Sequence, residues 1–254
     1  EIRGSFEDSS LTQQKLTSPI EEVKDIIFDM LEKHIIYISK MIYNTDRLLS
    51  MKVKEDVIQN YKRLTGQKAK YFTFMGPQPV TLTKKHIQQG RNSILLDYAV
   101  TEKADGDRFE MYVYNKRGYL INSKQEVVDT GNTFNDIDGE WIFDGEYITR
   151  TKDNEPIHLY MIFDVYWCGK VTPKPIHRYP FVTSGEDVDR YTVMNDFVNK
   201  MMVNVVRDEF SIEVKCKEYL FGDQSTDDES TKTKIFEVSE TLLQRDSEGE
   251  YPYR

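Results

Sequence analysis

Residues 103–108 read Lys-Ala-Asp-Gly-Asp-Arg, and this stretch decides how the rest of the chain is interpreted. It follows a mostly apolar run at residues 94–100. A lysine amine can attack the α-phosphate of a nucleotide, and the glycine lets the backbone approach a ligand closely. By average residue usage, the pattern K-x-D-G-x-R would arise by chance in on the order of a few per thousand chains of this length. The stretch therefore predicts a nucleotide site with Lys103 as the nucleophile.

The composition is that of a folded protein. Charged residues make up 30% of the 254 positions and aromatic residues 12%, so a core can form. The net charge of −9 argues against binding nucleic acid through bulk charge but leaves room for a local basic groove. The four histidines are scattered, and the two cysteines lie in separate apolar runs. We therefore expect neither a zinc site nor a disulfide, and no run is apolar enough to cross a membrane.

Hydrophobic periodicity predicts an α+β fold with mostly antiparallel strands and helices outside. A capping box at residues 18–21 begins a helix over 19–41, and a weaker pattern indicates a second over 54–64. The turn at residues 115–118 joins two strands into a hairpin. The other expected elements are a short helix within 81–89, strands at 109–114, 119–122, 126–129, 141–148, 158–166 and 210–219, a helix over 188–206, and a solvated loop at 222–232.

Two acidic positions interrupt apolar strands. Glu146 follows Asp144-Gly145 and is either an ordinary edge or turn residue or a ligand for a ribose hydroxyl or a hydrated Mg²⁺. Asp164 must be paired with an arginine or ligate something, because burying a bare charge is costly. The neighbouring Phe163 either packs in the core or stacks on a purine.

Two lysines share one face of the last predicted strand. Lys215 and Lys217 alternate with Val214 and Cys216, so they lie on the polar side. Such a face is usually solvated, but in a nucleotide cleft the lysines would meet a base carbonyl or phosphates.

Taken in order, these segments resemble the covalent nucleotidyltransferase superfamily, which includes mRNA capping guanylyltransferases and polynucleotide ligases. Residues 103–108 are similar to its first motif, residues 144–146 to its third and residues 160–164 to the motif that follows. The resemblance implies a nucleotidyltransferase domain, ATP-grasp-like or DNA ligase-like, of antiparallel sheets flanked by helices. It also implies that the lysine forms a phosphoramide with the nucleotide.

Residues 74–82 and 210–219 are similar to the capping branch, in particular to the multifunctional enzymes of large DNA viruses. That resemblance implies GTP as substrate, Mg²⁺ (or Mn²⁺) as cofactor and the 5′-diphosphate end of RNA as acceptor. It implies roles as follows: Lys103 is catalytic, Arg108 binds ribose or phosphates, Glu146 binds ribose or metal, Phe163 binds the base, Asp164 binds metal, and Lys217, with Lys215 the weaker match, contacts the guanine edge.

The resemblance divides the chain near residue 70. Residues 1–70 are expected to be a helical segment, a linker or the tail of an upstream RNA triphosphatase module. Residues 71–254 are expected to be a nucleotidyltransferase domain that is incomplete at its C-terminus, because the fourth and fifth motifs and the oligonucleotide-binding (OB-fold) domain are not found. Triphosphatase and methyltransferase modules are expected in the same or a partner chain, with no membrane association and a location in the host cytoplasm or virion.

Two alternatives stay open at this point. A polynucleotide ligase would share the lysine, residues 144–146 and the fold but would load AMP from ATP. A catalytically inert module of the same fold would instead hold neighbouring domains or a partner together. The joint presence of Lys103, Arg108, Glu146 and Asp164 favours an enzyme.

Overall fold

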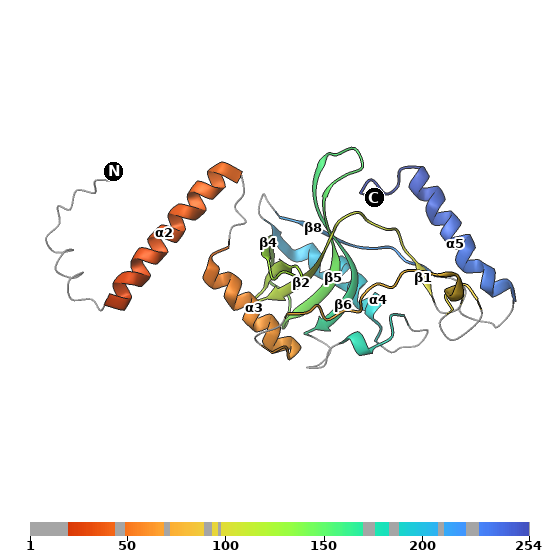
Figure 1. The fold of residues 1–254 in the computed structure, drawn as a ribbon, viewed down its shortest axis with the longest axis horizontal. Coiled ribbons are helices and arrows are strands. Elements are labelled where there is room, and N and C mark those ends of the chain that lie inside the picture. Colours follow the sequence, from red (N-terminus) through yellow and green to blue (C-terminus); the bar gives the residue numbers. More distant parts are fainter. Residues whose placement is uncertain are drawn as a thin grey trace. The chain divides into compact units, whose positions relative to one another are not determined.

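The computed structural model describes residues 20–43, 49–68, 72–88, 93–95, 98–169, 176–182, 188–207, 211–221 and 229–253. The chain divides into two compact units, residues 1–50 and 51–254. The first contains helix α2 (Ile20–Tyr43), which confirms the helix predicted over residues 19–41 (Figure 1). The second contains helix α3 (Met51–Thr65), the sheets and all later elements. The domain boundary that we predicted near residue 70 stays a prediction.

A seven-stranded sheet forms the centre of the second unit (Figure 1). Its strand order is β7-β4-β3-β2-β5-β6-β8, and every neighbouring pair is antiparallel except β6 and β8, which are parallel. The strands are β2 (Asp107–Tyr114), β3 (Arg117–Ile121), β4 (Val127–Phe134), β5 (Trp141–Arg150), β6 (Pro156–Cys168), β7 (Val205–Arg207) and β8 (Glu213–Cys216). The predicted α+β class, with antiparallel strands flanked by helices, is confirmed.

The alternation of β2 separates two faces of this sheet. Phe109, Met111 and Val113 point into the main core, where aromatic rings gather around Phe197; its ring centroid lies 4.3 Å from that of Phe143. A fully buried ring of this size contributes about 1.5–3 kcal/mol relative to an exposed one. Glu110 and Tyr112 face the other side, where Tyr61 of α3 contacts both.

The hairpin turn is shorter than predicted. Asn115 and Lys116 form the two-residue turn between β2 and β3, with φ values of 48° and 64°. Positive φ at both central residues is the turn geometry that matches the twist of the flanking strands. Arg117 and Gly118 already belong to β3, because they pair with Tyr114 and Val113.

Several other predicted boundaries were wrong. The helix predicted over 188–206 is α4 (Arg190–Asp196), followed by the π-turn η3 (Phe197–Met201), the 3₁₀ turn η4 (Met202–Asn204) and strand β7. The β-branched Val205 and Val206 favour extended backbone, and they pair with β4. Within 81–89 only the turn η1 (Lys84–His86) forms, and position 89 lies outside the described residues. The strand predicted over 210–219 shortens to β8, with position 210 outside the described residues.

The C-terminal helix was not predicted. Helix α5 (Glu229–Ser247) begins within the stretch that we expected to be a loop, while residues 222–228 lie outside the described residues. Ile235 and Leu242, seven residues apart, are buried on one face of α5. The helix packs on the two-stranded sheet of β1 (Ala99–Val100) and β9 (Leu220–Phe221). None of the helices in the described part of the chain is long and apolar enough to cross a membrane.

Candidate functional site

A pocket of about 490 Å³ lies beside the first residues of β2. Four of the predicted site residues, from three different strands, line it together: Arg108, Glu146, Phe163 and Asp164. Its size falls within the range of small-molecule sites. The complete lining is Pro77, Gln78, Pro79, Tyr98, Ala99, Arg108, Glu146, Phe163, Asp164, Tyr166, Phe181 and Tyr219.

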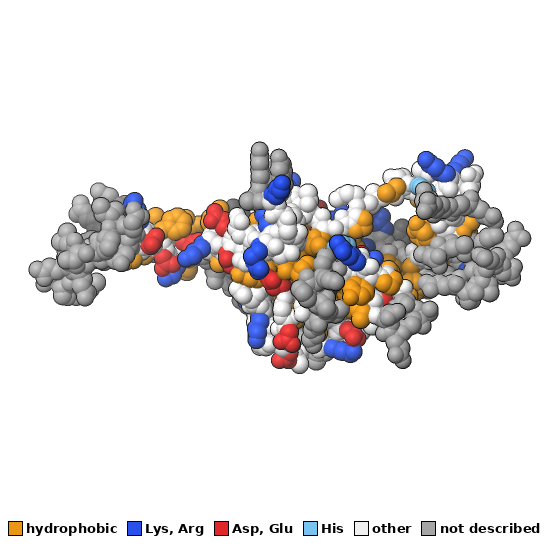
Figure 2. Space-filling model, turned by 90° about the horizontal axis from the view of Figure 1, so that it is seen from below, with side chains coloured by type: hydrophobic (Ala, Val, Ile, Leu, Met, Phe, Trp, Pro, Cys, Tyr) orange, Lys and Arg blue, Asp and Glu red, His pale blue; other side chains and the backbone are white. Residues whose placement is uncertain are grey.

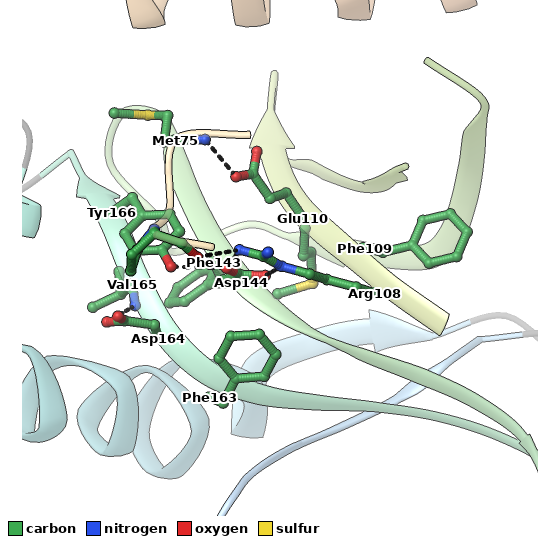
Figure 3. Close-up of polar contacts among 12 residues, drawn as sticks. Met75, Arg108, Phe109, Glu110, Phe143, Asp144, Phe163, Asp164, Val165 and Tyr166 are labelled. Carbon is green, nitrogen blue, oxygen red and sulfur yellow. Dashed lines mark hydrogen bonds and ion pairs between the residues drawn. The ribbon is translucent and has the colours of Figure 1, made fainter. Parts of the chain in front are cut away.

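The guanidinium of Arg108 is held in place by the fully buried carboxylate of Asp144. Its Nε and Nη2 donate to the two oxygens of Asp144 at 3.0 and 2.5 Å, and Tyr166 Oη donates to the same carboxylate at 2.7 Å (Figure 3). The hydrogen bonds to Asp144 raise the pKa of Arg108 above its usual value. The guanidinium also lies over the ring of Phe74, at 5.3 Å from the centroid, and near that of Phe163, at 6.0 Å. Arg108 is therefore a fixed positive charge in the pocket wall.

Lys217 is buried against the same wall. Its Nζ donates to Glu146 Oε2 at 3.1 Å and to the backbone oxygen of Glu102 at 3.2 Å, and it lies 5.6 Å from the centroid of Phe163. Only 6% of its side chain is exposed. Lys217 thus connects β5 with the residue that precedes Lys103. Lys215 is not brought to the site, since its side chain is 53% exposed and pairs with Glu213.

Asp164 forms an ion pair with Arg190. Its Oδ2 accepts from Arg190 Nη1 at 2.7 Å, and its Oδ1 accepts from the backbone of Val165 at 2.8 Å. Burial raises the pKa of Asp164 to about 6. The arginine partner that the sequence left open as an alternative is therefore present, supplied by the first turn of α4.

The loop that carries Lys103 is packed against β5 by the residues that follow the lysine, and the backbone oxygen of Glu102 just before it accepts from Lys217. Ala104 is buried with Ile148 of β5, and a Cβ at Gly106 would stand 2.7 Å from the backbone oxygen of Tyr147. The Lys103 side chain itself is 79% exposed, with Nζ 3.6 Å from Asp105 Oδ1, and it does not line the pocket. The glycine thus serves close packing on β5, and the lysine is presented to solvent from a rigid loop.

Comparison with known proteins identifies the family of this chain. Residues 31–239 match the family described as mRNA capping enzyme, catalytic domain. The chain belongs to this family. It is also similar to a probable mRNA-capping enzyme of Acanthamoeba polyphaga mimivirus, with 22% identity over 192 residues. That match covers 74% of this chain and 15% of the relative, so the chain spans a small part of the length of the viral protein.

In this capping-family domain, the acidic residues predicted to bind metal are already engaged. Glu146 is bound to Lys217 and Asp164 to Arg190. Within the described ranges there is no group of three or more His, Cys, Asp or Glu side chains placed to hold a metal ion. The residues present therefore do not form a metal cage, and Mg²⁺ in such pockets is commonly held through substrate phosphates and water.

Three contributors to the site were missed by the sequence analysis. Asp144, Tyr166 and the wall at residues 77–79 all border or support the pocket. Asp144 had a detectable signal, because it is an acid within a strand of large apolar residues. Tyr166 had none that separates it from ordinary core residues, whereas residues 77–79 lie within the segment 74–82 that resembles the capping branch, although no role in the site was assigned to them.

Proposed function

We propose that this domain is an mRNA 5′-guanylyltransferase in which Lys103 carries GMP covalently. The observation that supports it best is the pocket itself. Its lining includes a fixed arginine and an aromatic ring, and behind that ring lies a buried lysine, Lys217, which is hydrogen-bonded to the residue before Lys103. Together with membership of the capping family, this set suits a guanine nucleotide whose phosphates extend toward the lysine.

The proposed chemistry proceeds in two balanced steps. The Lys103 Nζ lone pair attacks the α-phosphorus of GTP, the bond to the bridging oxygen breaks, pyrophosphate leaves, and the amine proton passes to water. A terminal phosphate oxygen of a 5′-diphosphate RNA then attacks the same phosphorus. The P–N bond breaks, and the lysine recovers a proton as GMP joins the RNA.

Four residues in or beside the pocket have a role in this proposal. The purine stacks on Phe163, and Lys217 donates to the O6 carbonyl of guanine. Glu146 accepts from a ribose hydroxyl once Lys217 turns toward the base. Arg108 contacts the ribose or phosphates with the donors that Asp144 leaves available. Because the carboxylates are bound to cations, no step is assigned to a protein-held metal.

The RNA acceptor is expected to bind through local contacts. On the face seen in Figure 2, basic and acidic side chains are interspersed among hydrophobic ones. That distribution and the net charge of −9 do not favour binding through bulk charge. We also propose triphosphatase and methyltransferase modules in the same polypeptide or a partner, since the mimivirus relative extends far beyond the matched part.

One experiment separates the proposal from its rivals. The full polypeptide is incubated with Mg²⁺ and α-labelled GTP or ATP, beside the variants Lys103→Ala and Lys215→Ala. Lys215 is a matched control, because it is an exposed lysine outside the pocket. We expect an acid-labile adduct from GTP in the wild type and in Lys215→Ala, and none in Lys103→Ala. An adduct from ATP alone would indicate a ligase. Absence of any adduct would indicate an inert module, and an adduct on Lys103→Ala would refute the nucleophile.

A further inference from the structure

A fully buried carboxyl group with no role in the proposed chemistry lies behind the pocket. Glu110 follows Arg108 by two residues on β2, so the two side chains share one face of the sheet. Glu110 is 0% exposed. Its Oε2 is hydrogen-bonded to Tyr61 Oη from α3, and its Oε1 accepts from the backbone N–H of Met75 at 2.8 Å (Figure 3). One carboxyl group therefore joins β2, α3 and the segment that contains Met75.

That segment includes residues 77–79, which line the pocket, and residues 74–79 are called the pocket wall. Residues 72–80 form no helix or strand, so their place depends on contacts with other elements. Phe74 lies under the Arg108 guanidinium, Pro77 O is 3.4 Å from its Nη2, and residues 77–79 line the cavity. The wall also lies closely against β6, because a Cβ at Gly76 would be 2.1 Å from Tyr166 Oη. Two hydrogen bonds join this wall to β2: the one from the Met75 amide to Glu110, at 2.8 Å, and the longer one from Arg108 Nη2 to Pro77 O.

We infer that Glu110 is a positioning residue for the nucleotide pocket, which holds the wall of residues 74–79 in place and connects it to α3. The inference rests on the proposed function, because the wall matters only if the pocket takes a nucleotide. A buried carboxyl group is costly to retain, and one that joins three elements fixes their relative placement in a way that an apolar side chain does not.

The surroundings of Glu110 make this hydrogen-bonding group mostly uncharged at neutral pH. Burial raises the pKa of Glu110 to about 8, with a further upward contribution from the charge of Asp144 opposite it in β5. The hydrogen bonds from Tyr61 and Met75 and the charge of Arg108 offset part of this effect. The other titratable groups around it are the tyrosines Tyr61 from α3 and Tyr160 and Tyr166 from β6. Tyr61 Oη donates to Oε2 and the Met75 N–H donates to Oε1, so both oxygens of the carboxyl group are hydrogen-bonded.

The test uses three variants of the full protein. Glu110→Leu removes both hydrogen bonds. Glu110→Gln keeps both contacts, because its amide oxygen can accept from Met75 and its amide N–H can donate to Tyr61 Oη, which reverses the direction of that bond. Leu120→Ala is the stability control; Leu120 is buried on β3 and belongs to the main core, away from the wall. Amide hydrogen exchange at residues 73–79 is measured without nucleotide, and GTP binding is measured by calorimetry.

We expect Glu110→Leu to exchange the wall amides about ten-fold faster and to bind GTP about ten-fold more weakly, with Glu110→Gln close to wild type. Wild-type exchange at the wall in Glu110→Leu would overturn the inference. Equal acceleration in Leu120→Ala would also overturn it, because the effect would then follow global stability. The exchange measurement needs no nucleotide. If the wild-type protein binds no GTP, the proposed function is refuted. The exchange data would still show whether Glu110 holds the wall in place.

Discussion

Replacing Glu110 by glutamine should change how the stability of the protein depends on pH. The carboxyl group has a pKa of about 8 in the folded chain, against an ordinary value of 4.5. Between these values the native state keeps a proton that the unfolded state has released. The free energy of unfolding therefore falls as pH rises from about 4.5 to about 8, at up to about 1.36 kcal/mol per pH unit. Below and above this pH range, the Glu110 carboxyl group does not change how the free energy of unfolding depends on pH.

The magnitude follows from the width of that window. A difference of about 3.5 pH units corresponds to at most about 5 kcal/mol, of the same order as the total stability of many domains. Because glutamine does not titrate, the free energy of unfolding of Glu110→Gln lacks this dependence on pH. Asp164, whose pKa is raised to about 6, adds its own slope to both proteins and cancels in their difference.

Urea unfolding at half-unit steps from pH 4.5 to 8.5 measures the effect. The signal is the fluorescence of the two tryptophans, including the buried Trp141. We expect the wild type to lose stability relative to Glu110→Gln by a few kcal/mol across this range. Parallel stability curves for the two proteins would show that Glu110 is already charged in the folded state, and the reasoning from its burial would be wrong.

Two further substitutions probe the pocket, and a labelling reaction probes the burial of Cys216. Arg108→Lys cannot reproduce both hydrogen bonds to Asp144, so unfolding in urea should show a loss of about 2–4 kcal/mol and adduct formation should fall sharply. Gly76→Ala places a Cβ against Tyr166, so calorimetry should show weaker GTP binding while the far-ultraviolet circular dichroism is unchanged. Burial raises the pKa of Cys216 to about 12, so iodoacetamide at pH 8 should label it at least ten-fold faster in denaturant than in the folded protein; equal rates would refute its burial.

Local patterns predicted most of the strands and several pocket residues. The alternation in β2, the acid in β5 and the aromatic residue beside an acid in β6 are visible in the sequence, and antiparallel pairing brings them together. Pairing partners were not visible. Nothing local indicates that Lys217 binds Glu146 or that Asp164 binds Arg190, because these residues come from distant elements.

The polar face of β2 shows why the rest could not be predicted. The alternation of apolar and polar residues in β2 is the period of a half-buried strand, yet Glu110 and Tyr112 on its polar side are fully buried. Helix α3 and residues 72–80 cover that face, and neither has a signal that specifies where it packs. The short π-helix η3 after α4 was not predicted, for a similar reason. A helical period continues through it, while the packing of Phe197 in the core depends on the tertiary structure.

The parallel pairing of β6 with β8 sets an order of folding. Leu159 pairs with Glu213, 54 residues later, whereas the β2–β3 and β5–β6 hairpins close over short turns. Local pairs form faster than distant ones, since less chain entropy is lost before contact. Lys217 and Tyr219 follow directly after β8, so they reach the pocket after the hairpins have formed. In refolding, burial of Trp141 should therefore precede the capacity to bind nucleotide, and a chain stopped between the two would have a core without a site.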